Sequence, residues 1–274
     1  MDTSILSNTN RFIKIAAFDH RDSLRKSMPE DQIADFKTLC AKVFSPYVQS
    51  ILVDPIYGND AITVAINSGK TILLTREETG YTDNPDGRLT VLSNHFTSTK
   101  LKEMGANAIK LLMYYNSDAS NAQKQIDIAK RVRDETIDLN MPFLLEIVTY
   151  PVDGNPYHKG DAIVDAVSDL RTYSDILKLE YPVDPSAEDA ENAIPYLNQI
   201  SSEAEQPWVL LSRGMKFDFY KKALKISKEN GCKGFAVGRA VWQEVAELQN
   251  WDDKVNFMNT IGIKRMKELS DIWN

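Results

Sequence analysis

The sequence predicts an α/β protein built as a single (β/α)₈ barrel. Eight short β-rich runs recur along the chain, and polar segments with helical spacing separate them. The pattern fills about 250 residues, which is the length of a barrel of eight parallel strands. An open doubly wound sheet is the alternative, but it usually carries a glycine-rich turn after its first strand. Here that turn reads FDHRDSL, and neither GxGxxG nor GxxxxGK occurs.

The expected strands are, in chain order, FIKIAAFD, SILVDP, KTILLT, AIKLLMYY, PFLLEIVTY, DILKLEYP, PWVLLS and GFAVG. Apolar residues recur every three or four positions in 122–132 and in 217–227, which predicts helices that lay one face on the sheet. Gly231 supplies a stop for the second of these helices. The tail 251–274 is expected to form a helix that closes the barrel or contacts a neighbouring subunit.

Composition narrows the class of protein. The 274 residues carry a formal net charge of −7, so we expect no nucleic-acid partner. The longest apolar run, 111–115, is far shorter than the roughly 20 residues of a membrane span. No secretory signal precedes the first strand, so we expect a cytoplasmic protein.

No linker divides residues 1–274, which we expect to form one domain. Cys40 and Cys232 form no CxxC pair and are expected to be small buried hydrophobes.

Metal chemistry has little support in the sequence. His20, His95 and His158 are the only histidines, and no two of them are four residues apart. We expect His95 and His158 in exposed loops, and neither a metal nor another cofactor in the protein. Asp19 and Asp54, at the ends of the first two strands, are the alternative as magnesium ligands, although a structural hydrogen-bonding role is expected for Asp54.

Charged side chains fall where the interior of a barrel should be apolar. Because side chains alternate along a strand, DILKLEYP places Leu177 and Leu179 on the helix-facing side and Lys178 and Glu180 on the inner side. The same alternation sends Lys110 inward from the fourth run.

Three further runs bring carboxylates toward the same cavity. Alternation in the fifth run turns Glu146 inward, and the first two runs end in Asp19 and Asp54. Buried lysines favour the neutral amine, which is a nucleophile that can form a Schiff base with a ketone. The structural alternative is an ion-pair network without chemistry, with Lys178 on Glu180 and Lys110 on Glu146.

An anion site is expected where the seventh and eighth strands end. LLSRGM contributes Ser212 and Gly214, and FAVGRAVW contributes Gly238 and Arg239 before a helix. Glycines let backbone N–H groups approach a phosphate, and arginine binds its oxygens in a fork. Barrels commonly hold phosphate at this position.

The sequence resembles the class I tagatose 1,6-bisphosphate aldolases and the related 6-deoxy-6-sulfofructose 1-phosphate aldolases. The resemblance covers nearly the whole chain and rests on AFDHRDSL, SPYVQSILVDPIYG, LLTREETGY, IKLLMYYNSD, FLLEIVTY, ILKLEYPV, LSRG and GRAVW, in the family's order. It implies a Schiff-base aldolase that acts on a phosphosugar.

The resemblance also implies roles for individual residues. Lys178 would be the Schiff-base lysine, Lys110 the second active-site lysine and Glu146 a proton-transfer carboxylate, with Asp19 and Arg21 at the polar end of the first strand. The phosphate-binding positions would be Ser212, Gly214, Gly238 and Arg239.

The chain departs from the family at two positions that bear on substrate choice. His20 stands where glutamine is usual, and Arg213 replaces a small residue, so both are candidates for the second anion site. We expect a homo-oligomer that cleaves a ketohexose 1,6-bisphosphate to dihydroxyacetone phosphate and glyceraldehyde 3-phosphate. The alternatives are cleavage of 6-deoxy-6-sulfofructose 1-phosphate, which would release sulfolactaldehyde, and a non-catalytic regulatory protein that binds a sugar phosphate.

Overall fold

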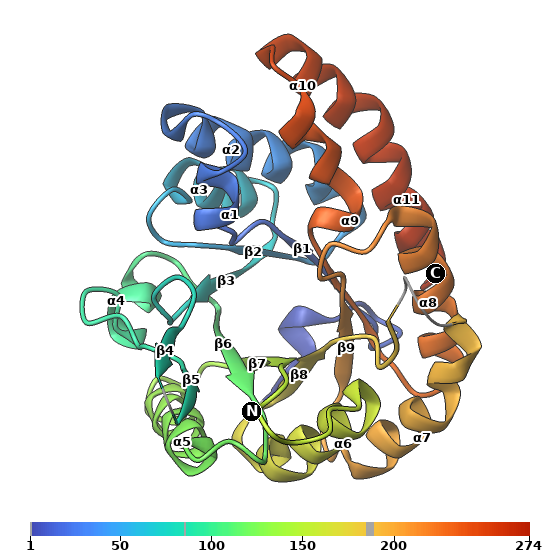
Figure 1. Cartoon of the computed structure of the whole chain (residues 1–274). Helices are drawn as coiled ribbons and strands as arrows, with labels where there is room; N and C mark the ends of the chain where they lie inside the picture. Colours follow the sequence, from blue (N-terminus) through green and yellow to red (C-terminus); the bar gives the residue numbers. More distant parts are fainter. Residues whose placement is uncertain (1, 85, 185–188) are drawn as a thin grey trace.

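Eight parallel strands close into a barrel in the computed structural model, which describes residues 2–84, 86–184 and 189–274 (Figure 1). Their order around the barrel is β1-β10-β9-β8-β7-β6-β3-β2. The strands are β1 (Ile13–Ala17), β2 (Ser50–Val53), β3 (Thr71–Thr75), β6 (Ala108–Tyr115), β7 (Phe143–Thr149), β8 (Ile176–Leu179), β9 (Trp208–Leu211) and β10 (Gly234–Val237). All eight predicted strands are confirmed, and so is the (β/α)₈ barrel.

Helices surround the strands (Figure 1). They are α1 (Asp22–Arg25), α2 (Ile33–Phe44), α3 (Asn59–Asn67), α4 (Ser98–Glu103), α5 (Ala122–Asp138), α6 (Lys159–Leu170), α7 (Ile194–Glu203), α8 (Phe217–Glu229), α9 (Arg239–Trp242), α10 (Trp251–Phe257) and α11 (Ile263–Asp271). The two predicted helices are α5 and α8, and Gly231 follows α8 with a φ of 98°. Within the described residues, no helix has the length and apolar character needed to cross a bilayer.

The C-terminal tail closes the ring of helices. A π-helical turn, Met258–Gly262, joins α10 to α11, and this segment packs against α2 while α11 also contacts α8. Trp273, just beyond α11, is fully buried. The tail therefore covers the barrel next to β1, as predicted, and a homo-oligomer stays a prediction.

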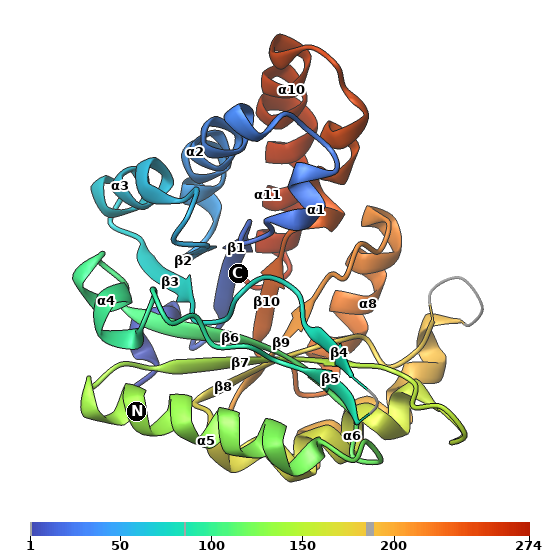
Figure 2. The same ribbon diagram turned by 60° about the vertical axis from the view of Figure 1, so that its left-hand side comes forward.

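A hairpin that the sequence did not predict lies between β3 and α4. Its strands, β4 (Thr82–Asn84) and β5 (Gly87–Leu89), pair antiparallel within the turn-rich segment after β3 (Figure 2). The guanidinium of Arg88 lies over the rings of Tyr81 and Tyr150, with Cζ 4.4 and 4.7 Å from the ring centroids. A third ring, that of Tyr114 in β6, lies 5.5 Å from the same atom, so the described part of the hairpin packs on the end of β6 and on Tyr150 without pairing with the barrel strands.

The barrel has an apolar interior near the amino ends of its strands. One cluster of buried side chains fills it, with Leu6, Ile13, Ile15, Ala17, Leu52, Leu73, Ala108, Leu144, Ile176, Val209 and Ala236. Leu177 and Leu179 belong to the separate cluster between strands and helices. The predicted alternation of faces is thus confirmed, and the next inward layer along the strands is charged.

One close approach between strands requires a glycine. Gly234 begins β10 beside β1, and a Cβ there would lie 1.7 Å from the carbonyl oxygen of Ile13. We expect Gly234→Ala to lower the free energy of unfolding by roughly 3 kcal/mol or more, because the strand pair must separate. Gly69→Ala is the control: its φ is also positive, at 66°, but the space around it is open, so a loss of roughly 1 kcal/mol is expected. Urea unfolding that gives equal losses would contradict this account.

Candidate active site

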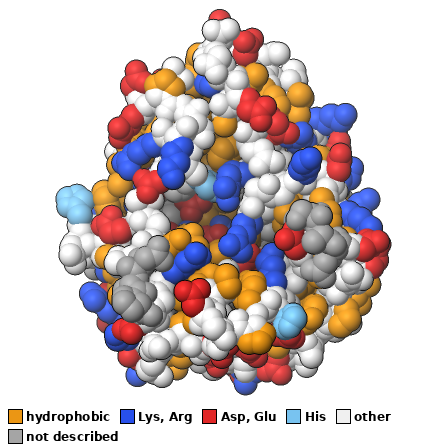
Figure 3. Space-filling model, in the orientation of Figure 1, with side chains coloured by type: hydrophobic (Ala, Val, Ile, Leu, Met, Phe, Trp, Pro, Cys, Tyr) orange, Lys and Arg blue, Asp and Glu red, His pale blue; other side chains and the backbone are white. Residues whose placement is uncertain are grey.

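A cavity of about 290 Å³ opens at the carboxyl ends of the strands. Side chains from β6, β7 and β8 and from the turns after β1, β3, β9 and β10 line it. Figure 3 shows a hollow near the centre of this face, with acidic side chains inside it and Lys and Arg side chains around it. This is the end at which barrel enzymes carry their active sites.

Two lysines share one carboxylate oxygen at the base of the cavity. Oε2 of Glu146 lies 2.8 Å from Nζ of Lys178 and 2.9 Å from Nζ of Lys110. The register explains the first contact, because Glu146 pairs with Lys178 across β7 and β8. All three side chains point inward, as the alternation predicted. Glu146 is only 9% exposed and the lysines less, so the charges interact with little water between them.

Lys110 has two further carboxylate partners. Its Nζ lies 2.8 Å from Oδ2 of Asp19 and 2.8 Å from Oε1 of Glu77. The other oxygen of Glu77 accepts the N–H of Leu112 at 3.0 Å. Burial alone would lower the pKa of Lys110, but the three carboxylates raise it well above its ordinary value. Lys110 is therefore a permanent cation at neutral pH.

The pKa values of the carboxylates shift in the opposite direction to that of Lys110. Burial pulls the pKa of Glu146 upward, yet Lys110 and Lys178 together hold it below its ordinary value. The pKa of Asp19 is likewise lowered, because the same two lysines outweigh its burial. Both groups are ionised at neutral pH and can accept protons.

Glu180 does not join this cluster, which corrects the expected pairing with Lys178. It follows the last residue of β8 and lies higher at the rim, where it forms an ion pair with Arg213 and lies 3.6 Å from Nζ of Lys159. It also accepts the N–H of Thr149 at 2.7 Å. Two residues along a strand span about 6.6 Å, so Glu180 meets the loop after β9 instead of the lysine layer.

Asp54 also turns away from the cavity. Its carboxylate forms a fully buried ion pair with Lys37 of α2 and accepts the N–H groups of Ile56 and Tyr57 at 2.9 and 3.0 Å. The expected structural role is what the structure shows. The prediction that five strands bring lysines and carboxylates toward one cavity is wrong for Asp54, because β2 ends at Val53 and the backbone of the following turn binds the Asp54 carboxylate.

The predicted anion-binding residues meet at one side of the cavity. The N–H of Gly238 donates to Oγ of Ser212 at 3.4 Å. A Cβ on Gly214, whose φ is 75°, would lie 3.6 Å from Cζ of Arg239. Among the described residues no carboxylate is within ion-pair distance of Arg239, and burial lowers its pKa. The helix after Gly238 has only four residues, so we expect Arg239, rather than the terminus of this helix, to contribute most to anion binding.

Arg21 and His20 reach the cavity from the turn after β1. Arg21 is buried, and its Nη2 donates to the carbonyl of Glu77 at 2.9 Å. The His20 ring packs edge-on against Trp242, with centroids 5.3 Å apart, and Cε1 would lie 2.9 Å from a Cβ on Gly238. His20 thus lies beside Arg239, at the first of the predicted anion sites, and its role at a second anion site stays a prediction. Arg213, in the turn after β9, also lines the cavity and forms an ion pair with Glu180.

Sequence reasoning missed Glu77. The residue lies in the LLTREETGY motif, two residues after the end of β3, so its place near a strand end was a usable signal. His95 and His158 are exposed, as predicted. Within the described ranges no group of three or more His, Cys, Asp or Glu side chains is placed to hold a metal ion.

Comparison with known proteins identifies the family. The model of the DeoC/LacD family aldolases matches residues 13–244. The tagatose 1,6-diphosphate aldolase of Staphylococcus aureus strain bovine RF122 / ET3-1 is 31% identical over 303 residues, covering 97% of this chain and 92% of its own. The tagatose 1,6-diphosphate aldolase of strain JH9 is equally similar. The chain belongs to the DeoC/LacD aldolase family, and the protein is an aldolase, a carbon–carbon lyase.

Solved structures agree on the fold. A Schiff-base-forming fructose-1,6-bisphosphate aldolase superposes with a TM-score of 0.72 at 14% identity, over 98% of this chain and 97% of its own. The fructose-bisphosphate aldolase of Plasmodium falciparum gives a TM-score of 0.75 at 11% identity, over 98% and 92%. At these identities the similarity establishes the barrel alone.

The half-buried imidazole of His20 predicts an acid-sensitive contribution to stability. Burial lowers the pKa of His20 to about 3, an effect opposed by Asp19 and reinforced by Arg239 and Lys178. Between pH 6.5 and pH 3 the unfolded chain therefore binds a proton that the folded chain does not, so stability falls as the pH falls through this window. We expect wild type to lose roughly 2 kcal/mol relative to His20→Gln between pH 6.5 and pH 4.5.

Chemical denaturation at a series of pH values measures this difference. His95→Gln is the matched control, since His95 is exposed and should leave the pH dependence unchanged. If His20→Gln follows the wild-type curve, the imidazole is not held neutral in the folded state.

Proposed function

We propose that this aldolase reversibly cleaves a ketohexose 1,6-bisphosphate, such as tagatose 1,6-bisphosphate, through an imine on Lys178. The observation that carries the proposal is the 2.8 Å contact between Nζ of Lys178 and Oε2 of Glu146 inside the cavity. It pairs a primary amine with a carboxylate that can take its proton. The substrate is taken from the similar Staphylococcus aureus proteins, which are tagatose 1,6-diphosphate aldolases.

The surroundings of the two lysines favour Lys178 as the nucleophile. Lys110 is held by Asp19, Glu77 and Glu146, and its pKa is raised, so it stays a cation. Among the described residues Lys178 contacts a single carboxylate. An ammonium ion has no lone pair to attack a ketone, whereas an amine that has passed its proton to Glu146 does.

Lys178 and Glu146 together supply the nucleophile and the proton acceptor that each step of the cleavage requires. The amine of Lys178 adds to the C2 carbonyl. Glu146 returns the proton it took from Lys178 to the departing hydroxyl, so loss of water leaves a protonated imine and an ionised Glu146. When the C3–C4 bond breaks, its electron pair moves into the imine to form an enamine, and the C4 hydroxyl proton passes to Glu146. Glyceraldehyde 3-phosphate leaves, and protonation and hydrolysis of the enamine release dihydroxyacetone phosphate and regenerate Lys178. Lys110 and Asp19 orient the substrate oxygens and hold Glu146 in place.

The C1 phosphate fits the side of the cavity formed by Ser212, Gly238 and Arg239. Arg239 brings a guanidinium that has no carboxylate partner among the described residues. A phosphate there would compensate a half-buried charge, which the structure otherwise leaves to solvent. 6-Deoxy-6-sulfofructose 1-phosphate is the competing substrate, and a coupled assay with both sugars distinguishes them.

Borohydride trapping tests the nucleophile. Reduction of the enzyme with dihydroxyacetone phosphate present should give a stable amine on Lys178, because the imine is reduced in place. Peptide mass mapping locates the adduct. An adduct on Lys110, or none at all, would refute the assignment.

Turnover of Glu146→Gln tests the proton acceptor. We expect kcat for cleavage to fall by about 10² to 10⁴, the range for a general acid–base group, because glutamine keeps the shape but takes no proton. Binding should change less than turnover. The measurement is single-turnover cleavage, with the melting temperature determined on the same preparation. A destabilised variant with near-normal turnover would instead make Glu146 a structural partner of Lys110.

Arg239→Ala tests the anion site. We expect binding of phosphorylated substrates to weaken by roughly 1.5 to 3 kcal/mol, the worth of a hydrogen bond to a charged group. The loss is measured as kcat/KM with a phosphorylated ketose and with its unphosphorylated analogue. An equal loss with both sugars would show that Arg239 is structural.

A further inference from the structure

A lysine occupies a core position of α2. The buried face of this helix carries Ile33, Phe36, Cys40 and Phe44, and Lys37 lies among them with no exposed surface. Lys37 does not line the active-site cavity. Its charge is therefore buried at a place where it cannot contact substrate, and burial lowers its pKa.

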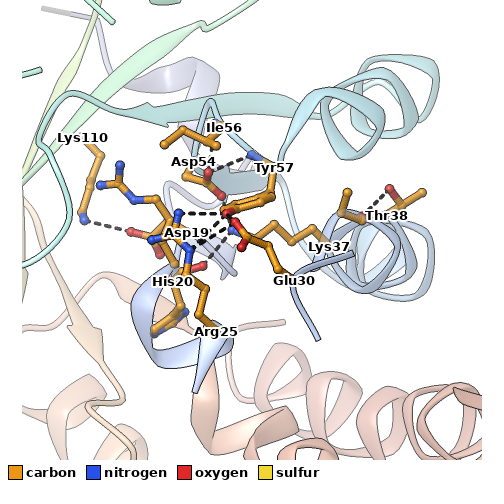
Figure 4. A network of polar contacts seen from close by, with 12 residues as sticks. Asp19, His20, Arg25, Glu30, Lys37, Thr38, Asp54, Ile56, Tyr57 and Lys110 are labelled. Atoms are coloured by element: carbon orange, nitrogen blue, oxygen red, sulfur yellow. Dashed lines mark hydrogen bonds and ion pairs between the residues drawn. The ribbon is translucent and has the colours of Figure 1, made fainter. Parts of the chain in front are cut away.

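Two acceptors hold the ammonium group of Lys37 (Figure 4). One is the carboxylate of Asp54, at the end of β2, with which it forms a fully buried ion pair. The other is the backbone carbonyl of His20, which accepts from Nζ at 2.8 Å. Asp54 is itself fixed by the N–H groups of Ile56 and Tyr57. Lys37 thereby ties the turn after β1 to the turn after β2.

Stability alone does not account for this arrangement. A buried ion pair loses solvation that its mutual attraction offsets only in part, and well-packed apolar residues of similar size are often as stable. An apolar pair would fill the same space between α2 and β2. What it could not supply is a donor for the His20 carbonyl.

The carbonyl that Lys37 holds belongs to the peptide between two residues of the site. On one side of this peptide, His20 packs against Trp242, and its neighbour Asp19 reaches Nζ of Lys110 at 2.8 Å. On the other side, Arg21 donates to the carbonyl of Glu77. One hydrogen bond thus orients a turn that places three consecutive side chains in the cavity.

We propose that Lys37 is a positioning residue for the aldol reaction: its bond to the His20 carbonyl, braced by Asp54, sets the turn that aims Asp19 at Lys110. The expected effect of Lys37 on turnover rests on the proposed function. The expected effect of Lys37 on the conformation of the turn after β1 does not. Displacing Asp19 would remove one of the three carboxylates on Lys110 and disturb the position of Glu146 beside Lys178.

The test removes the donor without leaving a charge buried. In Lys37→Met/Asp54→Asn the asparagine oxygen can still accept the N–H groups of Ile56 and Tyr57, but nothing donates to the His20 carbonyl. We expect kcat for cleavage to fall by about 10- to 100-fold, as for a small misplacement of a catalytic group, with KM within about threefold of wild type. Amide hydrogen exchange in residues 18–25 should be faster than in wild type.

Lys14→Met is the matched control. Lys14 is also a buried lysine attached to β1, but it lies at the opposite end of the barrel, where it donates to the carbonyl of Ser270 at 3.0 Å and to Oδ1 of Asn274 at 2.7 Å. At a temperature where both variants are folded, Lys14→Met should keep wild-type kcat and wild-type exchange in residues 18–25. If the Met/Asn double variant does not fold, Lys37→Gln/Asp54→Asn retains polar pairing but its shorter amide does not reach the carbonyl, and the same losses are expected.

The possible results separate the two proposals. Wild-type kcat and unchanged exchange in residues 18–25 in the folded double variant would overturn the positioning role. The positioning role would also be overturned if Lys14→Met, at the same drop in melting temperature, lost as much kcat and as much exchange protection in residues 18–25 as the double variant. If wild type itself forms no imine with dihydroxyacetone phosphate, the proposed function fails, and the exchange of residues 18–25 still decides whether Lys37 sets the turn.

Discussion

Inside the barrel, one carboxylate oxygen contacts two buried ammonium groups, and the residues at the carboxyl ends of the strands are arranged around this contact. Lys110 and Lys178 cannot both be buried as cations without compensation, because desolvation of each ion costs several kcal/mol. Glu146 bridges them, while Asp19 and Glu77 complete the shell of Lys110. The uneven distribution of carboxylates makes the two lysines chemically different.

The apolar layer below determines where this cluster forms. Ala108, Leu144 and Ile176 fill the interior two residues before Lys110, Glu146 and Lys178 on the same three strands. Because side chains on one face recur every second residue, the charged layer follows directly toward the carboxyl ends. The apolar packing near the amino ends of the strands thus fixes the position of the charged side chains near their carboxyl ends. The turn after β1 belongs to the same arrangement, since Lys37 holds it from outside the cavity.

Eight β-rich runs alternating with helical segments were enough to predict the barrel, and the period of two along the strands predicted the inward direction of Lys110, Glu146 and Lys178. It failed beyond the last paired residue of a strand, where alternation no longer constrains the chain. Glu180 and Asp54 each follow the end of a strand, and each turns to a nearby cation, Arg213 or Lys37. Such contacts depend on which loops meet in space, and local sequence carries no signal for that.

The measurement that tests the central claim most directly is the titration of Glu146 itself. ¹³C NMR of carboxyl-labelled glutamate, with the resonance assigned from Glu146→Gln, would follow this group in the free enzyme. The shared contact predicts that Glu146 titrates below the ordinary glutamate pKa of about 4.3 and that Lys110→Met raises its pKa. A pKa at or above the ordinary value in wild type, or one that Lys110→Met leaves unchanged, would contradict the shared-carboxylate account of the site.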